Sequence, residues 1–425
     1  MPLSQPRGVR DFGPAEAIAR KRIIAVIEET FKRFGFSPLE TPGIENMETL
    51  NAKAYGTDAS KQIYKLEDGE SGLRFDLTIP MARYVAMNTG MPLPFKRYQI
   101  GAAWRKDEPQ KMRYREFTQA DADIVGSASV ESEAEAISAA ALAIDELGIK
   151  EFAVVLNSRV ILDKVLASFG VPQDKHADVM RLIDKLDKSD RDTIVLQIQK
   201  LGVADRDAEK LMEFIKEEGS NDEKLGRVAA NIDGAKDEVE RLRKLLLLLD
   251  AYNLSNKVKV DLALARGLDY YTGAVWEYVA MDGEKRLPSI GSGGRYDKLL
   301  GIYAKNAIPA VGSSIGIDRV FDILEKTKPI QGTYAKLYIA TIGAENYQYA
   351  LGIAARARGM GIYTDVNLTD RNISKQLEYA NSLKFRYAII IGKIEKEARQ
   401  VKLRDLLDGK EEMLPADEAL GKMKE

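Results

Sequence analysis

The sequence has no cysteine and only one histidine, His176, among its 425 residues. The lack of cysteine excludes disulfides, thiol nucleophiles and thiolate zinc sites. A single histidine excludes HExxH metalloprotease sites and metal sites built from several histidines. Because His176 stands in a polar helical stretch, we expect it on the surface.

The sequence also lacks long apolar runs and an excess of either charge. Its longest leucine run, Leu245–Leu249, is far below the roughly 18 residues of a membrane span, and no apolar signal segment opens the chain. We therefore expect a cytoplasmic protein that does not use a membrane. The net charge of −2 excludes a uniformly basic nucleic-acid binder but is compatible with local basic patches. The length predicts two or three domains.

The stretch Phe95–Gly126 consists of two alternating segments joined by a charged loop. From Lys96 to Arg115 it carries seven basic and two acidic residues. Arginine presents a planar fork of donors that matches phosphate oxygens two at a time, so this loop suits a polyphosphate. Alternation on the returning strand puts three polar side chains on one face: Gln119, Asp121 and Asp123. The alternative is a solvated charged hairpin without a ligand.

Residues 104–121, WRKDEPQKMRYREFTQAD, resemble the second signature motif of class II aminoacyl-tRNA synthetases, in the version carried by histidyl-tRNA synthetases. Residues 35–45 resemble the first class II motif, which forms the dimer interface in that family. Residues 310–324 resemble the third motif, in which the residue matching Arg319 grips ATP. The resemblance implies an α/β (α+β) fold with an antiparallel-sheet catalytic domain. Taken alone, Arg319 would be a surface helix residue.

Three further segments resemble histidine-specific parts of that family. Residues 73–87 begin as a strand and become a helix, and their Asp76 and Thr78 match the pair that holds the histidine amino group. Capping of the following helix is the alternative for both. ARGLDYYTG (265–273) and SIGSGGRYD (289–297) resemble the two histidine-specific motifs. Aromatic packing in a sheet is the alternative for the tyrosines, and the glycines let the backbone approach a ligand closely.

The pattern divides the chain into three parts. Residues 1–157 and 254–328 carry the class II motifs and are assigned to the catalytic domain. Residues 158–253 are helical almost throughout, and the resemblance implies an inserted domain that leans on the tRNA acceptor stem. Residues 332–425 alternate strands and helices, which predicts a small α/β domain with a largely parallel sheet. Within it, NISKQLEYANSLKFRYAIIIG resembles the anticodon-binding domain of several class II synthetases.

The resemblance covers nearly the whole chain in the family's order and implies a histidine–tRNA ligase. Such an enzyme joins L-histidine to ATP as an adenylate, with Mg²⁺, and passes the histidyl group to the 3′ end of tRNA as a homodimer. Neither step needs a protein nucleophile. Both need two anions to be aligned and the charge at phosphorus to be stabilised. Arg105 and Arg266 are the expected catalytic residues.

The same resemblance assigns the other site residues. Histidine is expected to contact Asp76, Thr78, Arg105, Gln119, Asp123, Arg266, Tyr270, Tyr271 and Tyr296. ATP is expected to contact Arg105, Arg113, Phe117, which stacks on adenine, and Arg319. Asp123 accepts a ring N–H in this scheme, while Tyr271 and Tyr296 bond the other side. Gln119 and Asp76 hold the α-ammonium. The family often has Glu where this chain has the shorter Asp123.

Two other functions remain open. A histidine-binding regulatory relative of the same fold would lack ligase activity, but such relatives lose the anticodon-binding domain or key arginines, and this sequence has both. A class II ligase for proline or glycine is disfavoured by ARGLDYYTG and GSGGRYD. Histidine-dependent ATP–pyrophosphate exchange separates the three.

Overall fold

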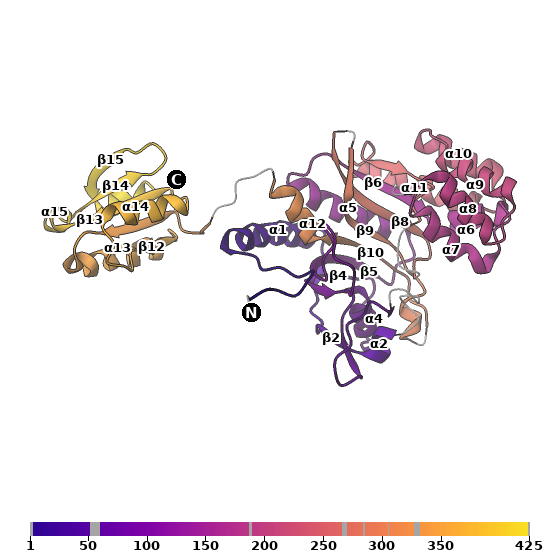
Figure 1. Ribbon diagram of the computed structural model, residues 1–425, viewed down its shortest axis with the longest axis horizontal. Helices are drawn as coiled ribbons and strands as arrows, with labels where there is room; N and C mark the ends of the chain where they lie inside the picture. The colour runs from indigo at the N-terminus through magenta and orange to yellow at the C-terminus, as the bar shows by residue number, and fades with distance from the viewer. Residues whose placement is uncertain are drawn as a thin grey trace. The chain divides into compact units, whose positions relative to one another are not determined.

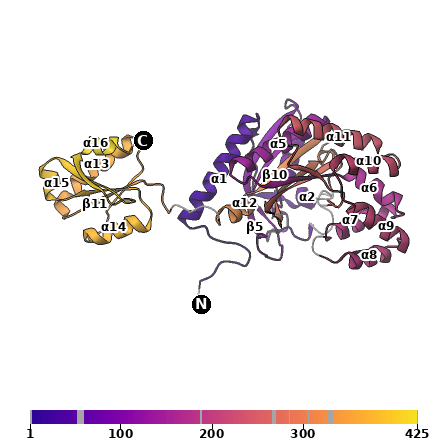
Figure 2. The same ribbon diagram turned by 90° about the horizontal axis from the view of Figure 1, so that it is seen from above.

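The structure is a computed structural model that describes residues 3–51, 60–186, 189–265, 270–283, 285–304, 306–326 and 332–423. Figures 1 and 2 show it in two orthogonal views. The chain divides into two compact units: Met1–Arg10 with Ile23–Leu324, and Asp11–Arg22 with Glu325–Glu425. The domain boundaries expected at residues 157, 254 and 328 stay predictions.

The larger unit is built on an eight-stranded sheet with the strand order β1-β4-β5-β10-β9-β8-β6-β7 (Figure 1). Neighbouring strands are antiparallel, except that β1 pairs with β4 and β6 with β7 in parallel. The predicted antiparallel sheet is confirmed. The strands are β1 (Ser37–Pro38), β4 (Phe95–Trp104), β5 (Glu116–Val125), β6 (Phe152–Ser158), β7 (Val258–Val260), β8 (Ala274–Asp282), β9 (Lys285–Arg295) and β10 (Ala310–Gly316).

Helix α5 (Val130–Glu146) covers one face of this sheet, and its many alanines let the helix approach closely. Ser313 Oγ of β10 donates a hydrogen bond to Ala136 O of α5 at 2.9 Å. Ser313 pairs with Ala122 of β5, so Ala122 also faces α5. Since side chains alternate along a strand, the opposite face carries its two neighbours, Asp121 and Asp123.

The stretch predicted to be helical after β6 is helical in the structure. It contains α6 (Arg159–Ser168), η1 (Gln173–Lys175), α7 (His176–Ile183), α8 (Arg191–Lys200), α9 (Asp205–Lys216), α10 (Asn221–Asn231) and α11 (Lys236–Ala251). The other elements of the larger unit include β2 (Ile44–Asn46), α2 (Met47–Asn51), β3 (Ser71–Leu73), α4 (Thr78–Met87), η2 (Leu300–Ile302) and α12 (Ile317–Leu324). Helix α1 (Pro14–Arg33) is divided between the units at Arg22. Among the described residues, no helix is long and apolar enough to cross a bilayer.

The surface position expected for His176 is wrong, because its side chain is buried at the start of α7. One ring nitrogen lies 3.1 Å from Asp163 Oδ1, and the other lies 3.2 Å from Val171 O. The apolar residues of α7, such as Val179 and Ile183, are also buried and hold the helix against its neighbours. Partners for both ring nitrogens make the burial of a polar ring tolerable.

The smaller unit contains a five-stranded sheet with the order β12-β11-β13-β14-β15. The prediction of a largely parallel sheet holds for its first three strands, but β14 and β15 extend it as an antiparallel meander. The strands are β11 (Leu337–Thr341), β12 (Thr364–Val366), β13 (Tyr387–Ile391), β14 (Gln400–Asp405) and β15 (Glu411–Pro415). The helices are η3 (Ala344–Asn346), α13 (Tyr347–Gly359), α14 (Ile373–Ser382), α15 (Lys393–Glu397) and α16 (Ala416–Gly421). Apolar side chains such as Ile339, Ile353 and Ile389 give the unit a core of its own.

Candidate active site

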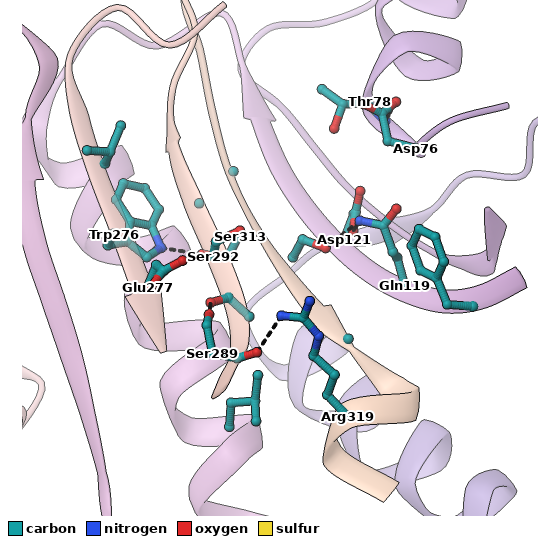
Figure 3. A pocket seen from close by; sticks show the side chains of 18 of the residues that line it. Asp76, Thr78, Gln119, Asp121, Trp276, Glu277, Ser289, Ser292, Ser313 and Arg319 are labelled. Atoms are coloured by element: carbon teal, nitrogen blue, oxygen red, sulfur yellow. Dashed lines mark hydrogen bonds between the residues drawn. The ribbon is translucent and has the colours of Figure 1, made fainter. Parts of the chain in front are cut away.

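A cavity of about 660 Å³ lies in the larger unit, on the sheet face that carries Asp121 and Asp123 (Figure 3). Arg266 falls outside the described residues. Every other site residue expected from the sequence lines this cavity: Asp76, Thr78, Arg105, Arg113, Phe117, Gln119, Asp123, Tyr270, Tyr271, Tyr296 and Arg319. Their roles toward a ligand stay predictions, but segments far apart in the chain meet here as the resemblance implies.

Asp123 is already engaged by the protein itself. The hydroxyl of Tyr296 donates to its Oδ1, and Arg97 Nη2 lies 2.7 Å from its Oδ2. Arg97 is completely buried, and it stands directly across from Asp123 in the pairing of β4 with β5. Arg97 Nη2 also donates to Leu77 O at 3.1 Å. Burial raises the pKa of Asp123 despite the opposing effect of Arg97.

Asp121 is the second buried carboxylate on this face of β5, and only 2% of it is exposed. Burial, followed by the nearby charge of Asp123, raises its pKa to about 7. Its partner across β10 is Ser314. Gln119, which Figure 3 shows beside Asp121, donates from Nε2 to Ser314 Oγ at 2.8 Å. The Oε1 atom of Gln119 is buried without a donor among the described residues.

Asp76 caps the following helix, which was one of the two interpretations that the sequence left open, and its role toward a ligand stays a prediction. Its Oδ1 accepts from Thr78 N at 3.1 Å and Ile79 N at 3.0 Å, so it stabilises the first turn of α4. Asp76 and Thr78 also line the cavity, opposite Gln119 and Asp121 in Figure 3. The helix start therefore fixes a carboxylate at the wall of the site.

Three tyrosines form an aromatic wall. The ring centres of Tyr270 and Tyr271 lie 4.9 Å apart, and those of Tyr270 and Tyr296 lie 5.7 Å apart. The sequence left ligand contact and aromatic packing open for these residues, and the rings do pack on one another. Burial raises the pKa of Tyr271 and Tyr296, so both keep their hydroxyl protons at neutral pH.

The glycines of β9 and β10 make room for side chains of the protein. A Cβ atom on Gly294 would lie 2.5 Å from Tyr271 Cδ1, and one on Gly312 would lie 2.0 Å from Asp123 Oδ1. On the α5 side of the sheet, a Cβ on Gly293 would lie 2.6 Å from the Trp276 ring. The close approach expected toward a ligand is therefore, in this structure, an approach to the residues that shape the cavity.

The other end of the cavity carries guanidinium groups. Arg105 Nε donates to Phe75 O at 3.1 Å, and its guanidinium carbon lies 4.9 Å from the centre of the Phe117 ring. Arg105 therefore contacts Phe117, and adenine stacking on that ring requires the opposite face or a shift of Arg105. Arg319 Nη1 donates to Ser289 O at 2.6 Å, as Figure 3 shows, and its Nε donates to Met112 O at 3.3 Å.

Arg113, expected at the ATP phosphates, forms a two-pronged ion pair with Asp107. Its Nε lies 2.8 Å from Asp107 Oδ2, and its Nη2 lies 2.9 Å from Oδ1. Both residues belong to the loop between β4 and β5, and both line the cavity. A phosphate that binds Arg113 must therefore share it with Asp107 or displace that carboxylate.

The cavity residues that had no assigned role in the sequence interpretation include Asp121, Trp276, Arg181 and Lys185. Arg97, which pairs with the cavity residue Asp123, had none either. Alternation did place Asp121 on the site face, so its signal was present. To predict the pairing of Arg97 with Asp123, one must know the register of the hairpin, and the sequence alone does not give this register. Arg181 lies in the last turn of α7 and Lys185 follows two residues after the helix, and no local motif marks them.

Comparison with known proteins agrees with this geometry. A family model described as histidyl-tRNA synthetase matches residues 8–320, and one described as an anticodon binding domain matches residues 336–425. The histidine–tRNA ligase of Aeropyrum pernix is 38% identical over 426 residues, covering 98% of this chain and 96% of that protein. The histidine–tRNA ligase of Porphyromonas gingivalis is 36% identical over 450 residues, covering 98% of each.

Solved structures give the same picture. A crystal structure of histidyl-tRNA synthetase from Nostoc sp. PCC 7120 matches with a TM-score of 0.87 at 28% identity, covering 100% of this chain and 99% of that one. A Bacillus halodurans protein titled as an ATP phosphoribosyltransferase regulatory subunit/histidyl-tRNA synthetase matches with a TM-score of 0.76 at 22% identity, covering 92% and 99%. That second likeness shows the fold alone. From the family match, the identities and the shared fold, this chain belongs to the histidyl-tRNA synthetase family.

Proposed function

We propose that the cavity is where this chain, a histidine–tRNA ligase, joins L-histidine to ATP and then passes the histidyl group to tRNA. One observation carries the proposal: the same cavity is lined by carboxylates with tyrosines and by guanidinium groups, which we interpret as a carboxylate end and a guanidinium end. The first suits an amino acid with a cationic α-ammonium and a nitrogen-containing ring. The second suits the phosphates of a nucleotide.

The first step is the attack of a histidine carboxylate oxygen on the α-phosphorus of ATP, which breaks the bond to pyrophosphate. Two anions must approach, so cations beside them lower the barrier. We assign Arg105 to this task, because it lies at the cavity wall and its bond to Phe75 O fixes the side chain. The matching assignment of Arg266 stays a prediction from the sequence.

The rest of ATP is assigned to the guanidinium end. Arg113 and Arg319 bind the outer phosphates, and Phe117 stacks on adenine. The described residues hold no group of three histidine or carboxylate side chains that could bind a metal. Mg²⁺ would therefore take most of its ligands from the phosphates and water, a common arrangement for this ion, and would offset phosphate charge.

The amino acid is assigned to the carboxylate end. Asp76, Thr78 and Gln119 face the α-ammonium, and the buried Oε1 of Gln119 supports this because it is an acceptor that needs a donor. The three tyrosines enclose the ring, and Asp123 shapes that end through its bond with Tyr296. A site that bonds the ring nitrogens rejects other amino acids, because its buried groups would go unpaired.

For the second step, the tRNA end must reach the adenylate while the anticodon is held elsewhere. Arg181 of α7 and Lys185, two residues beyond its end, line the cavity, which supports a contact between the inserted helices and the acceptor end. Residues 336–425 are assigned to the anticodon. We further propose a cytoplasmic homodimer that uses residues 35–45, where Ile44 is 53% exposed.

ATP–pyrophosphate exchange across the twenty amino acids tests the function. We expect exchange with histidine alone, and sedimentation should give the mass of a dimer. Exchange with proline or glycine instead would overturn the assignment of the amino acid. Histidine binding without exchange would point to the regulatory alternative, which is not favoured because Arg105, Arg319 and the smaller unit are all present.

A further inference from the structure

A buried carboxylate outside the cavity holds two arginines from distant parts of the chain. Glu133, in the first turn of α5, is completely buried. Its Oε1 accepts from Arg295 Nε at 2.7 Å, and its Oε2 accepts from Arg241 Nη2 at 3.0 Å. Arg295 is the last residue of β9, whereas Arg241 belongs to α11, the last of the inserted helices. Glu133 therefore connects the sheet of the larger unit with the helices inserted into it.

Arg295 lies in the motif SIGSGGRYD, but its side chain has no donor to spare for a ligand. The side chain is 4% exposed, and a guanidinium has five N–H donors. Five acceptors take these donors: Glu133 Oε1, Ser127 O, Asp297 Oδ1, Ser129 O and Ser132 Oγ. Arg295 is also not among the described residues that line the cavity. It can therefore act on the site only through the residues that it holds.

The backbone of Arg295 anchors the aromatic wall of the cavity. Its carbonyl accepts from Thr272 N at 2.8 Å, directly after Tyr271 in the chain. The residue after Arg295 is Tyr296, the second tyrosine of the wall. Gly273 packs against the same side chain, since a Cβ there would lie 3.1 Å from Arg295 Cδ. Both tyrosines thus leave a junction that the buried guanidinium fixes.

The second arginine ties the same carboxylate to the inserted helices. Arg241 Nη2 also donates to Ala128 O, just before α5, at 3.2 Å. Three residues earlier on α11, Glu238 Oε1 accepts from Ser158 Oγ at 2.5 Å, and Ser158 caps α6. The first and last inserted helices are therefore joined close to the point where α11 is bound to α5. A buried ion pair is costly to break on one side, so both attachments depend on Glu133.

We propose that Glu133 is a positioning residue for the binding of L-histidine, because it fixes Arg295 and so sets the places of Tyr271 and Tyr296. Since Arg241 binds its second oxygen, the attachment of α11 sets these places as well. This inference rests on the proposed function, which assigns the tyrosines to the amino acid, and deepens it. Histidine affinity then depends on a carboxylate that lies outside the cavity.

The test measures the KM for histidine and for ATP in pyrophosphate exchange, and the affinity for histidine by calorimetry. In Glu133→Gln, the amide oxygen can still serve Arg295, but the amide NH₂ then faces the cation of Arg241. We expect the KM for histidine to rise roughly 10- to 100-fold, the cost of a displacement of about 1 Å, and the KM for ATP to change less than about 3-fold. Arg243→Met, on the same helix but paired with the exposed Asp222 and Glu240, is the control and should leave both constants unchanged.

A double variant separates positioning from a general loss of stability. When Arg241→Met is added to Glu133→Gln, the cation that opposes the amide NH₂ is gone. The KM for histidine should then fall by about 3-fold or more relative to Glu133→Gln, since changes at residues that share a partner are not additive. Losses that simply multiply in the double variant would overturn the proposal. An unchanged KM for histidine in Glu133→Gln, or equal rises for histidine and ATP, would also overturn it.

Arg241→Met alone is the second measurement if Glu133→Gln does not melt cooperatively, because the side chain of Arg241 is 27% exposed. It should raise the KM for histidine by about 3-fold or more, as expected for one lost hydrogen bond to a charged group, and leave the KM for ATP unchanged. An unchanged KM for histidine would then refute the positioning role. Binding does not depend on turnover, so a wild-type chain that binds histidine without exchange refutes the ligase and still tests Glu133.

Discussion

The guanidinium of Arg97 is completely buried and lies 2.7 Å from Asp123. Inside a protein, an ion pair of this kind is expensive to break on one side, because the remaining charge stays in a poorly solvating environment. Arg97 also bonds Leu77 O, next to Asp76 in the chain. One side chain thus connects Asp123 with the segment that carries Asp76, two residues that are proposed to shape the amino-acid end of the cavity.

Removal of Arg97 alone should therefore strongly destabilise the folded protein. Arg97→Met is expected to cost about 3–5 kcal/mol of unfolding free energy, measured by urea denaturation. The double variant Arg97→Met with Asp123→Asn should recover part of that loss, because no unpaired charge is left. Lys150→Met, which breaks an exposed pair with Asp145, should cost about 1 kcal/mol or less and serves as the control. A simple sum of the two single losses would refute this coupling.

The raised pKa of Asp121 gives a pH dependence with a definite sign. Between pH 4 and pH 7 the unfolded chain has released this proton while the folded chain still holds it, so folding loses stability as the pH rises through this window. Asp121→Asn lacks this loss. The free energy of unfolding of the variant should therefore rise relative to that of the wild type by at most about 1.4 kcal/mol per pH unit from pH 4 to 7. Above pH 7 the difference between the two proteins should stay constant. If Asp121 has an ordinary pKa, melting curves over this range would show a difference in stability between the variant and the wild type that does not change with pH.

At the scale of strands and helices, β9 and β10 decide how close the aromatic wall can come to β5. Their glycines leave space that any Cβ would fill, at Gly294 for Tyr271 and at Gly312 for Asp123. Gly294 and Gly312 are themselves paired across the two strands. The sheet is therefore thinned at the point where the amino acid is proposed to bind.

Gly294→Ala should displace the Tyr271 ring, because the new carbon would lie 2.5 Å from Cδ1. Overpacking of this kind typically costs about 1–3 kcal/mol of stability. We expect the KM for histidine in exchange to rise by an order of magnitude or more, with a smaller effect on the KM for ATP. Gly90→Ala meets nothing within 4 Å and should leave both constants unchanged. Equal KM values for Gly294→Ala and the wild type would show that the ring does not depend on this gap.

Local pattern was enough to predict much of this architecture. Alternation predicted the strands of the hairpin and the shared face of Gln119, Asp121 and Asp123, and the motifs predicted which segments meet. What failed depends on contacts between segments. The pairing of Asp123 with Arg97 depends on the register between β4 and β5. The ion pair between Asp107 and Arg113 depends on how their loop folds. The burial of His176 depends on how α7 packs against its neighbours. Two strands of the smaller unit, β14 and β15, were missed because a short antiparallel meander has no strong sequence period.

For the whole molecule, we expect the two units to have different tasks in tRNA ligation. Each unit has its own sheet and its own buried apolar cluster. The cavity and all described site residues belong to the larger unit. On the proposed assignments, we expect activation of the amino acid to depend on the larger unit and selection of the tRNA to depend on both.

A chain that ends after Lys328 tests this division. It should retain histidine-dependent exchange within about an order of magnitude, because no described cavity residue is removed. It should lose most of its tRNA charging, measured as transfer of labelled histidine. If exchange and charging fall together while the truncated chain still melts cooperatively, the smaller unit acts in catalysis as well as in tRNA binding.

The enclosed ring of His176 also has a practical consequence for spectroscopy. It is the only imidazole in the chain, and both of its nitrogens are engaged, by Asp163 and by the Val171 carbonyl. In magnetic resonance, the imidazole of a bound substrate would therefore have to be distinguished from only one protein imidazole. The tautomer and charge of the substrate can thus be followed during turnover without isotopic replacement of any residue.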